Sequence, residues 1–269
     1  MYINKKIIGI LAVAIFTVGL IAGCGSSGEK KASQAPEKII KAGCTGVSYP
    51  DSFKENGKLT GYDVEILELA AKNLGYKVEW VNTDFAGLIG QLDAGKIDTI
   101  ANNVSITPPR KEKYYFSEPF LYEGTQFVTH KDNKDINDPK DLFGKTVAGV
   151  AGSNHLKVVE QAFPNGNIKI RTYENRDGAM NDLINKRVDG YVNARNVLVA
   201  TIKKANLPFK LVGDLFVIRP SAYPFLKNEK GKKLNDEFTK ELQRLRKDGT
   251  MKKISEKYYG TDVSVDPGK

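Results

Sequence analysis

The chain has 269 residues, 41% of them hydrophobic, and a formal net charge of +9 at pH 7. The lysines are scattered among acidic residues, as in KNEKGKK and KKISEK, which favours a solvated basic face and argues against a nucleic-acid-binding patch. The two cysteines and two histidines have no metal-ligand spacing, so we expect no disulfide, no metal and no cofactor.

The first 37 residues have the pattern of a targeting segment. Lys5 and Lys6 precede an apolar run over residues 7–20, and small residues lead to Cys24. This predicts a signal peptide over residues 1–23, followed by a flexible Gly/Ser/Lys-rich tether over residues 24–37. The small residues directly before Cys24 resemble a bacterial lipobox, which implies that Cys24 carries the lipid anchor (palmitate) of a lipoprotein. An ordinary signal peptide or an uncleaved anchor is the alternative.

About 230 residues would remain, which suits one large domain or two lobes. We expect strands at residues 39–44, 77–81 and 97–100, and helices at residues 64–74 and 85–93, with an Asn-Gly hairpin turn at residues 54–58. Asp63 is a candidate cap for the first helix. This βαβαβ order predicts a parallel sheet, in which ligands bind beyond the carboxyl ends of the strands. The loops at residues 45–49 and 102–110 and the helix start at Phe85 should therefore meet in one crevice.

A second βα series follows a charged, turn-rich boundary at residues 131–141. We expect strands at 125–130, 146–150, 168–173 and 189–193, and helices at 155–163, 177–185 and 196–205. The chain then returns at 220–224 to two final helices, 229–248 and 251–258. These elements predict an α/β, two-lobed, periplasmic-binding-protein-like (type II) clamshell with a hinge. Lobe 1 would comprise residues 38–128 plus 221–262, lobe 2 residues 129–220, and a disordered tail residues 263–269.

One stretch, DTIANNVSITPPRKEKYYFSEPF over residues 98–120, has the character of an anion cradle. A strand ends in Asn and Ser residues, Pro108-Pro109 should break any helix, and Arg110 follows on the stiff turn. Arginine suits a carboxylate because its planar fork donates two parallel hydrogen bonds. Ser153 and Asn154 stand at a helix N-terminus, where free backbone N–H groups also favour an anion. The alternative is a solvated loop with a surface arginine.

Several motifs together resemble the bacterial extracellular solute-binding proteins of the polar amino-acid uptake family, the capture subunits of ABC importers. They are GKLTGYDVEI, GLIGQLDAGKIDTI, SITPPRKEKYYFSEPF, DLFGKTVAGVAGSN and LRKDGTMKKISEKYYG, and the match covers residues 38–262. Some phrases, such as DTIANNVSIT, are closest to the cystine-binding branch. The resemblance implies a monomeric lipoprotein that faces outside the cytoplasm, is anchored to the cell membrane, and passes a small amino acid or carboxylate to an ABC permease.

The resemblance also implies roles for individual residues. Arg110 matches the arginine that clamps the ligand α-carboxylate. Asn103 and Ser105 match residues that bond the ligand's main-chain groups, and Ser153 and Asn154 match those that meet the carboxylate from the other lobe. Tyr49 and Phe85 match residues that sandwich the ligand side chain.

The segment Val192-Asn193-Ala194-Arg195 departs from the family pattern, because members usually carry an Asp where this chain has Ala194. That Asp pairs with the ligand ammonium, and a buried ammonium without a counter-charge is costly. Three interpretations stay open: Asn193 and Ser105 supply neutral acceptors, the ligand lacks an ordinary ammonium, or Ala194 weakens binding.

Two other functions are compatible with the same fold. An enzyme on the same fold, such as a dehydratase or a lyase, would need catalytic residues, and His155 is the only candidate general base near the crevice. A ligand sensor or an adhesin would share the fold with the capture protein. We therefore expect a binding protein and no enzyme.

Overall fold

The computed structural model describes residues 38–266. The chain divides into a unit that ends at Ala35 and a unit that begins at Pro36, and the elements named here belong to the second. The predicted signal peptide, the lipidation site at Cys24 and the tether over residues 24–37 lie outside the described residues. Within residues 38–266, no helix is long and apolar enough to cross a membrane.

A three-stranded parallel sheet comes first, in the order β5-β1-β6. Its strands are β1 (Lys38–Cys44), β5 (Tyr76–Asn82) and β6 (Thr99–Ile100), and its crossover helices are α1 (Tyr62–Asn73) and α2 (Phe85–Asp93). This confirms the predicted βαβαβ series. Each helix ends where a glycine, Gly75 or Gly95, takes a positive φ that other residues adopt only with strain.

The chain segment between β1 and α1 forms a small antiparallel sheet. Its strands are β2 (Val47–Ser48), β3 (Ser52–Glu55) and β4 (Lys58–Thr60). Asn56 and Gly57 connect β3 to β4 with φ values of 52° and 77°, as a tight hairpin requires. The predicted hairpin turn is therefore confirmed.

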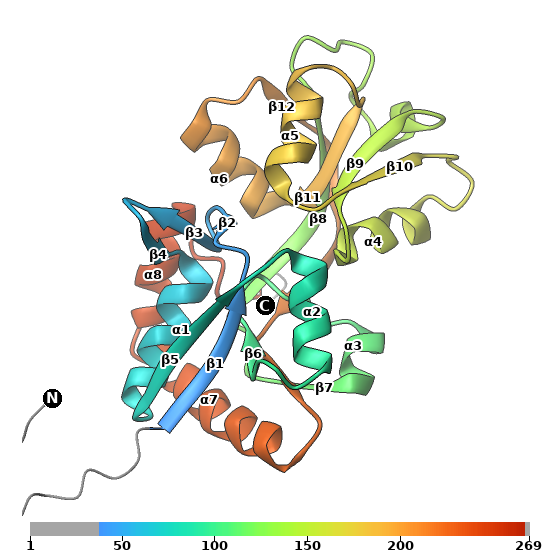
Figure 1. The fold of residues 1–269 in the computed structure, drawn as a ribbon. Coiled ribbons are helices and arrows are strands. Elements are labelled where there is room, and N and C mark those ends of the chain that lie inside the picture. The colour runs from blue at the N-terminus through green and yellow to red at the C-terminus, as the bar shows by residue number, and fades with distance from the viewer. Residues whose placement is uncertain (1–37, 267–269) are drawn as a thin grey trace, which may run out of the picture. The chain divides into compact units, whose positions relative to one another are not determined.

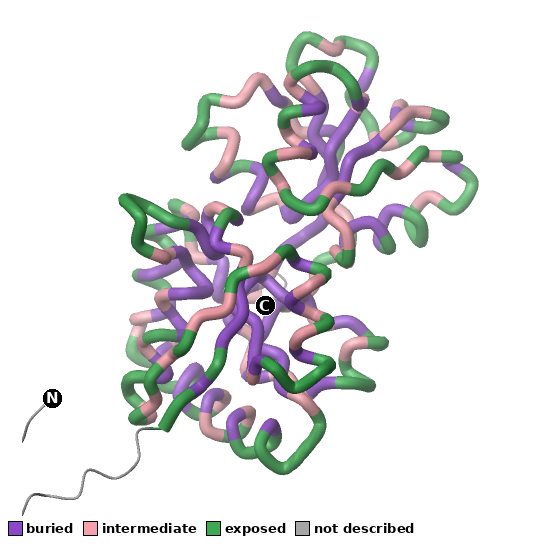
Figure 2. Tube along the Cα trace, in the orientation of Figure 1, coloured by how far each residue is buried: buried purple, intermediate pink, exposed green. Residues whose placement is uncertain are grey.

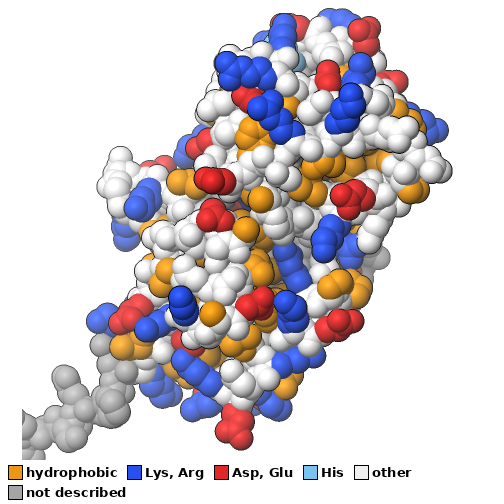
Figure 3. Space-filling view, turned by 45° about the vertical axis from the view of Figure 1, so that its right-hand side comes forward, with side chains coloured by type: hydrophobic (Ala, Val, Ile, Leu, Met, Phe, Trp, Pro, Cys, Tyr) orange, Lys and Arg blue, Asp and Glu red, His pale blue; other side chains and the backbone are white. Residues whose placement is uncertain are grey.

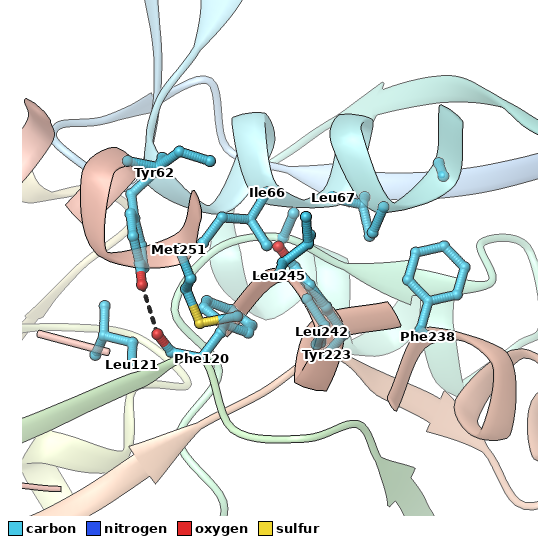
Figure 4. Packing of buried hydrophobic residues seen from close by; sticks show 14 of the residues in the cluster. Tyr62, Ile66, Leu67, Phe120, Leu121, Tyr223, Phe238, Leu242, Leu245 and Met251 are labelled. Atoms are coloured by element: carbon cyan, nitrogen blue, oxygen red, sulfur yellow. Dashed lines mark hydrogen bonds between the residues drawn. The ribbon is translucent and has the colours of Figure 1, made fainter. Parts of the chain in front are cut away.

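Different helices cover the two faces of the first sheet. On one face, α1 packs with α7 (Glu229–Lys247) and α8 (Thr250–Tyr259), so the C-terminal helices return to the first sheet (Figure 1). Figure 4 shows Leu242 and Leu245 of α7 in this core with Ile66 of α1, each side chain contributing roughly 1.5–3 kcal/mol through burial. The hydroxyl of Tyr62 donates to the carbonyl of Phe120 at 2.5 Å. On the other face, α2 packs against β6.

A five-stranded mixed sheet follows, in the order β10-β9-β11-β8-β12. Its strands are β8 (Leu121–His130), β9 (Thr146–Val150), β10 (Lys169–Tyr173), β11 (Gly190–Ala194) and β12 (Phe209–Ser221). Its helices are the 3-10 turn η1 (Pro139–Leu142), α4 (Asn154–Ala162), α5 (Arg176–Ile184) and α6 (Arg195–Ala205). Strands β9, β10 and β11 are parallel, and β8 runs antiparallel to β11 and β12. Figure 2 shows buried segments along the strands of both sheets.

Strands β8 and β12 connect the part of the chain around the three-stranded parallel sheet to the five-stranded sheet (Figure 1). β7 (Tyr114–Phe116) precedes β8 and pairs with β13 (Pro224–Leu226), which follows β12. An isolated bridge joins Ser105 to Ser221 at the same crossing. Two adjacent extended crossings are what a hinge between two lobes requires.

Two expectations about local structure were wrong. Pro108-Pro109 does not exclude a helix but begins one, α3 (Pro108–Lys113), because proline at the first helical positions lacks only N–H groups that have no helical partner. Asp63 does not cap α1; Gly61 occupies the cap position, and the buried Asp63 carboxylate accepts from the backbone N–H of Asn103 at 2.5 Å.

Two other segments also differ from expectation. Strand β12 was not predicted, because its burial does not alternate and its register shifts on either side of Phe216. In the predicted tail, Val263 and Ser264 are buried, and the carbonyl of Val263 accepts from the N–H of Tyr122 at 2.8 Å. Order therefore extends beyond residue 262.

Candidate functional site

A cavity of about 160 Å³ lies where loops from both sheets meet. The segments that follow β1, β5, β6, β9 and β10 all reach it, as expected at the carboxyl ends of parallel strands. Apart from Tyr49, the residues predicted to bind ligand all line it: Phe85, Asn103, Ser105, Arg110, Ser153, Asn154 and Asn193. Their roles toward a ligand stay predictions.

Arg110 connects loops of the two sheets. Its Nη1 donates to the carbonyl of Ser105 at 3.0 Å, and its Nη2 donates to the carbonyl of Gly152 at 3.2 Å. The guanidinium carbon lies 5.7 Å from the centre of the Phe85 ring. Burial lowers the pKa of Arg110 from its usual value, yet a guanidinium stays charged at neutral pH. The further N–H donors of this fork are suited to a carboxylate in the cavity.

Asn103 and Ser105 are held by a buried acid, Glu123 of β8. The Asn103 Nδ2 donates to Glu123 Oε2 at 2.7 Å, and the Ser105 hydroxyl donates to Glu123 Oε1 at 3.2 Å. Because these donors are turned to Glu123, the oxygens of both side chains are left as acceptors. The Asn103 Oδ1 is buried and has no hydrogen-bond partner in the described structure. Both residues line the cavity, where the Ser105 hydroxyl is a neutral acceptor.

Burial shifts both Glu123 and His155 toward their neutral forms. Burial raises the pKa of Glu123 to about 7, and burial, assisted by Arg176, lowers the pKa of His155 to about 3. Their closest atoms, Glu123 Oε1 and His155 Nε2, are 3.7 Å apart, while His155 Nδ1 lies 2.9 Å from the hydroxyl of Thr125. Because His155 is neutral, this contact is not an ion pair near neutral pH.

A second arginine, Arg176 at the start of α5, also lines the cavity. Its Nη2 lies 2.7 Å from Asp51 Oδ2, and its Nη1 donates to the carbonyl of Tyr49 at 3.0 Å. Burial opposes the charge of Arg176, but attraction to the fully buried Asp51 outweighs it and raises the pKa of Arg176. This ion pair joins the loop after β2 to α5, which packs on the five-stranded sheet.

Tyr49 contributes to this contact through its backbone, and its ring does not line the cavity. The Tyr49 ring packs edge-on against Phe53 with centroids 5.0 Å apart. The Lys204 Nζ lies over it at 4.4 Å. The predicted sandwich of a ligand side chain by Tyr49 therefore has no support from its position.

Asn193 and Ala194 are both buried at the end of β11. Asn193 Oδ1 accepts from the N–H of Ala194 at 2.8 Å, and its Nδ2 donates to the hydroxyl of Tyr191 at 2.5 Å. The oxygen of Asn193 is therefore occupied, unlike that of Asn103. Ala194 is the N-cap of α6, and its side chain makes no cap bond and does not line the cavity.

Two acids that the sequence reading missed line the cavity, Asp84 and Glu174. Asp84 Oδ1 accepts from the N–H of Gly87 at 2.8 Å as the N-cap of α2. Glu174 follows β10 directly and has no hydrogen bond or ion pair within residues 38–266. The carboxyl-end rule that singled out Phe85 would also have found Glu174 and Arg176, which follow β10. Within residues 38–266, no group of three His, Cys, Asp or Glu side chains could hold a metal ion.

The chain is similar in sequence to known solute-binding proteins. Residues 40–261 match the model of the bacterial extracellular solute-binding proteins, family 3. The chain is 47% identical over 257 residues to the probable amino-acid-binding protein YxeM of Bacillus subtilis (strain 168), covering 96% of each protein. It is 31% identical over 269 residues to the L-cystine-binding protein TcyJ of Escherichia coli (strain K12), covering 97% of each.

Among solved structures, the putative L-cystine ABC transporter from Listeria monocytogenes is similar with a TM-score of 0.77 and 32% identity. The match covers 85% of this chain and 98% of that one. The likeness confirms the α/β, two-lobed type II fold. The relatives are named as binding proteins, which does not favour the enzyme alternative.

Proposed function

The chain belongs to the bacterial extracellular solute-binding proteins of family 3, and we propose that it captures an amino acid or a related small carboxylate for an ABC importer. The observation that carries this proposal is the position of Arg110. Its guanidinium lines a cavity between two sheets and touches backbone from both, at Ser105 and Gly152. A ligand carboxylate held there would contact both lobes and favour the closed form.

The other end of the ligand faces acceptors. The Ser105 hydroxyl accepts from the ligand ammonium, and Glu174 supplies the negative charge that Ala194 does not. On this proposal an ordinary amino acid can bind although the Asp of the family pattern is missing. L-cystine and similar sulfur-containing amino acids are the favoured ligands, in line with the name of the TcyJ relative.

The cellular setting is part of the same proposal. The protein acts outside the cytoplasm as a monomer, carries a lipid anchor at Cys24, and docks on a membrane permease. The hinge separates residues 38–128 plus 221–262 from residues 129–220. The crossings of β8 and β12 support two connections, although they assign residues 121–128 to the second sheet.

Calorimetric titration of the purified protein tests the proposal. L-cystine is titrated first, followed by a panel of amino acids, N-acyl amino acids and organic acids. Saturable binding that Arg110→Lys reduces at least tenfold is the expected result, because lysine keeps the charge but loses the two-pronged donor. Binding that is equally tight in Arg110→Lys, or no binding by any member of the panel, would contradict it. Binding only of ligands without a free ammonium would exclude the role of Glu174.

A further inference from the structure

A second cavity of about 300 Å³ lies beside the first and shares part of its wall. Arg110, Ser153 and Asn154 line both cavities. The remaining wall comes from α2, from the start of α3, from α4 and from β12. Both lobes therefore contribute to the second cavity as they do to the first.

The lining of this second cavity is basic. Arg110, Lys157 and Arg219 line it, and its lining includes no Asp or Glu. Figure 3, in which the α2 and α4 side of the molecule is turned forward, shows Lys and Arg side chains in the middle of that face. Like charges gathered in one hollow without acids create a positive potential that attracts an anion.

None of these three cations has an ion pair within residues 38–266. Lys157 lies one turn after Asn154 on the same face of α4, so its ammonium extends from the helix face that lines the cavity. Arg219 lies opposite Glu123 in the ladder of β12 and β8, yet no ion pair joins them. The Nε of Arg219 is buried without a hydrogen-bond partner. Arg219 lines the cavity through its other atoms, so an anion there would meet the charge of the guanidinium and not this buried Nε.

We infer that the second cavity is a subsite for a second anionic group of the ligand. The inference rests on the proposed function, since it places the first carboxylate on Arg110. Because Arg110 lines both cavities, a ligand held by it can extend toward Lys157 and Arg219. The ligand class is then a small amino-acid derivative that carries two carboxylates.

A pair of isosteric ligands tests the charge without changing the size. S-carboxymethyl-L-cysteine carries the second carboxylate, and S-carbamoylmethyl-L-cysteine has a neutral amide in its place. In calorimetric titrations of the wild type, the carboxylate should bind about tenfold more tightly than the amide, as one charge-assisted contact allows. Raising the salt concentration should reduce this ratio.

Charge-removing variants then locate the contact. Lys157→Gln and Arg219→Gln should each bring the ratio of the two affinities close to one while the affinity for the amide stays within about twofold. Lys203→Gln, an exposed lysine in the last turn of α6, is the matched control and should keep the wild-type ratio. Lys157 is also exposed, so its variant keeps the test valid if Arg219→Gln does not fold.

The outcomes separate this inference from the proposed function. Equal affinity of the wild type for the two ligands, or a ratio that both variants leave unchanged, overturns the subsite while capture of an amino acid stands. Failure of the wild type to bind any amino acid, L-cystine included, overturns both. A ratio abolished by Lys203→Gln as well would assign the effect to general charge attraction, which also overturns the subsite.

Discussion

Glu123 is an acid near the start of strand β8, and the fold controls its protonation. Its carboxyl is buried beside Asn103 and Ser105, and burial raises the pKa from 4.5 to about 7. The folded protein therefore binds the proton more tightly than the unfolded chain does. Because the unfolded chain releases it first, the contribution of Glu123 to the free energy of unfolding falls as the pH rises from about 4.5 to about 7.

Substitution of Glu123 by Gln should remove this dependence. We expect Glu123→Gln to match the wild type near pH 4.5, where Glu123 is neutral, and to exceed its free energy of unfolding by about 3 kcal/mol at pH 8. Urea denaturation at a series of pH values measures the difference. The exposed Glu112→Gln serves as control and should follow the wild type. If the curves of Glu123→Gln and the wild type run parallel, the carboxyl of Glu123 titrates in its ordinary range.

Among the elements, the short helix α3 positions the arginine on which the proposed function depends. Thr107 is its N-cap, and the Thr107 hydroxyl accepts from the N–H of Arg110 at 3.4 Å. A helix of six residues has few hydrogen bonds of its own, so its cap matters for its position. The direction of the Arg110 side chain therefore depends on Thr107.

We expect Thr107→Ala to weaken ligand binding about fivefold, the equivalent of about 1 kcal/mol for a lost cap. Thr107→Ser keeps the hydroxyl and should bind as the wild type does. Calorimetry with L-cystine measures both. An unchanged affinity in Thr107→Ala would mean that the two prolines alone hold α3 in place.

The sequence was sufficient for elements whose signals are local. Apolar periodicity located the crossover helices, and the Asn56-Gly57 pair located the hairpin between β3 and β4. The carboxyl-end rule correctly indicated that Phe85 and parts of the loops at residues 45–49 and 102–110, with Arg110, line one cavity. Strand β12 was missed because its twisted, half-exposed course gives no period of two, and Val217 within it takes a positive φ.

Contacts between distant segments could not be predicted in this way. In the sequence, Glu123 is an ordinary charged residue of a strand. Its burial and altered pKa follow only from its contacts with Asn103 and Ser105. Asp51 and Arg176 are far apart in sequence, and neither lies in a motif that indicates the other. Their ion pair depends on how the loop after β2 meets α5, which only the three-dimensional arrangement determines.

For the whole molecule, the pair of Asp51 and Arg176 joins the two sheets through buried charges. Their side chains are 0% and 12% exposed. Removing one partner leaves the other charged and unpaired away from water, at a cost of about 3–5 kcal/mol. We expect Arg176→Met to lower the free energy of unfolding by about that amount. The double variant Asp51→Asn/Arg176→Met should lose less than the sum of the two single variants. Strictly additive losses in urea denaturation would show that the two charges do not stabilise each other.

Ligand binding should stabilise the whole molecule, because the cavity is lined by loops of both sheets. A ligand that binds only the folded state at about 100 times its Kd adds about 2.7 kcal/mol to the free energy of unfolding. For a chain of this size, that corresponds to a rise in melting temperature of roughly 5–10 °C. We expect this rise for the wild type with L-cystine, measured by calorimetric or fluorescence melting.

Two variants show which contacts produce that rise. Arg110→Lys should lose most of it, because its guanidinium contacts Ser105 and Gly152 from opposite sides of the cavity. Tyr49→Leu, which removes the ring, should keep it, since the Tyr49 ring packs on Phe53 and away from the cavity. A rise that survives in Arg110→Lys but is lost in Tyr49→Leu would reverse this assignment and make the aromatic ring the ligand contact. The melting experiment thus tests the arginine clamp and the aromatic sandwich against each other in one protein.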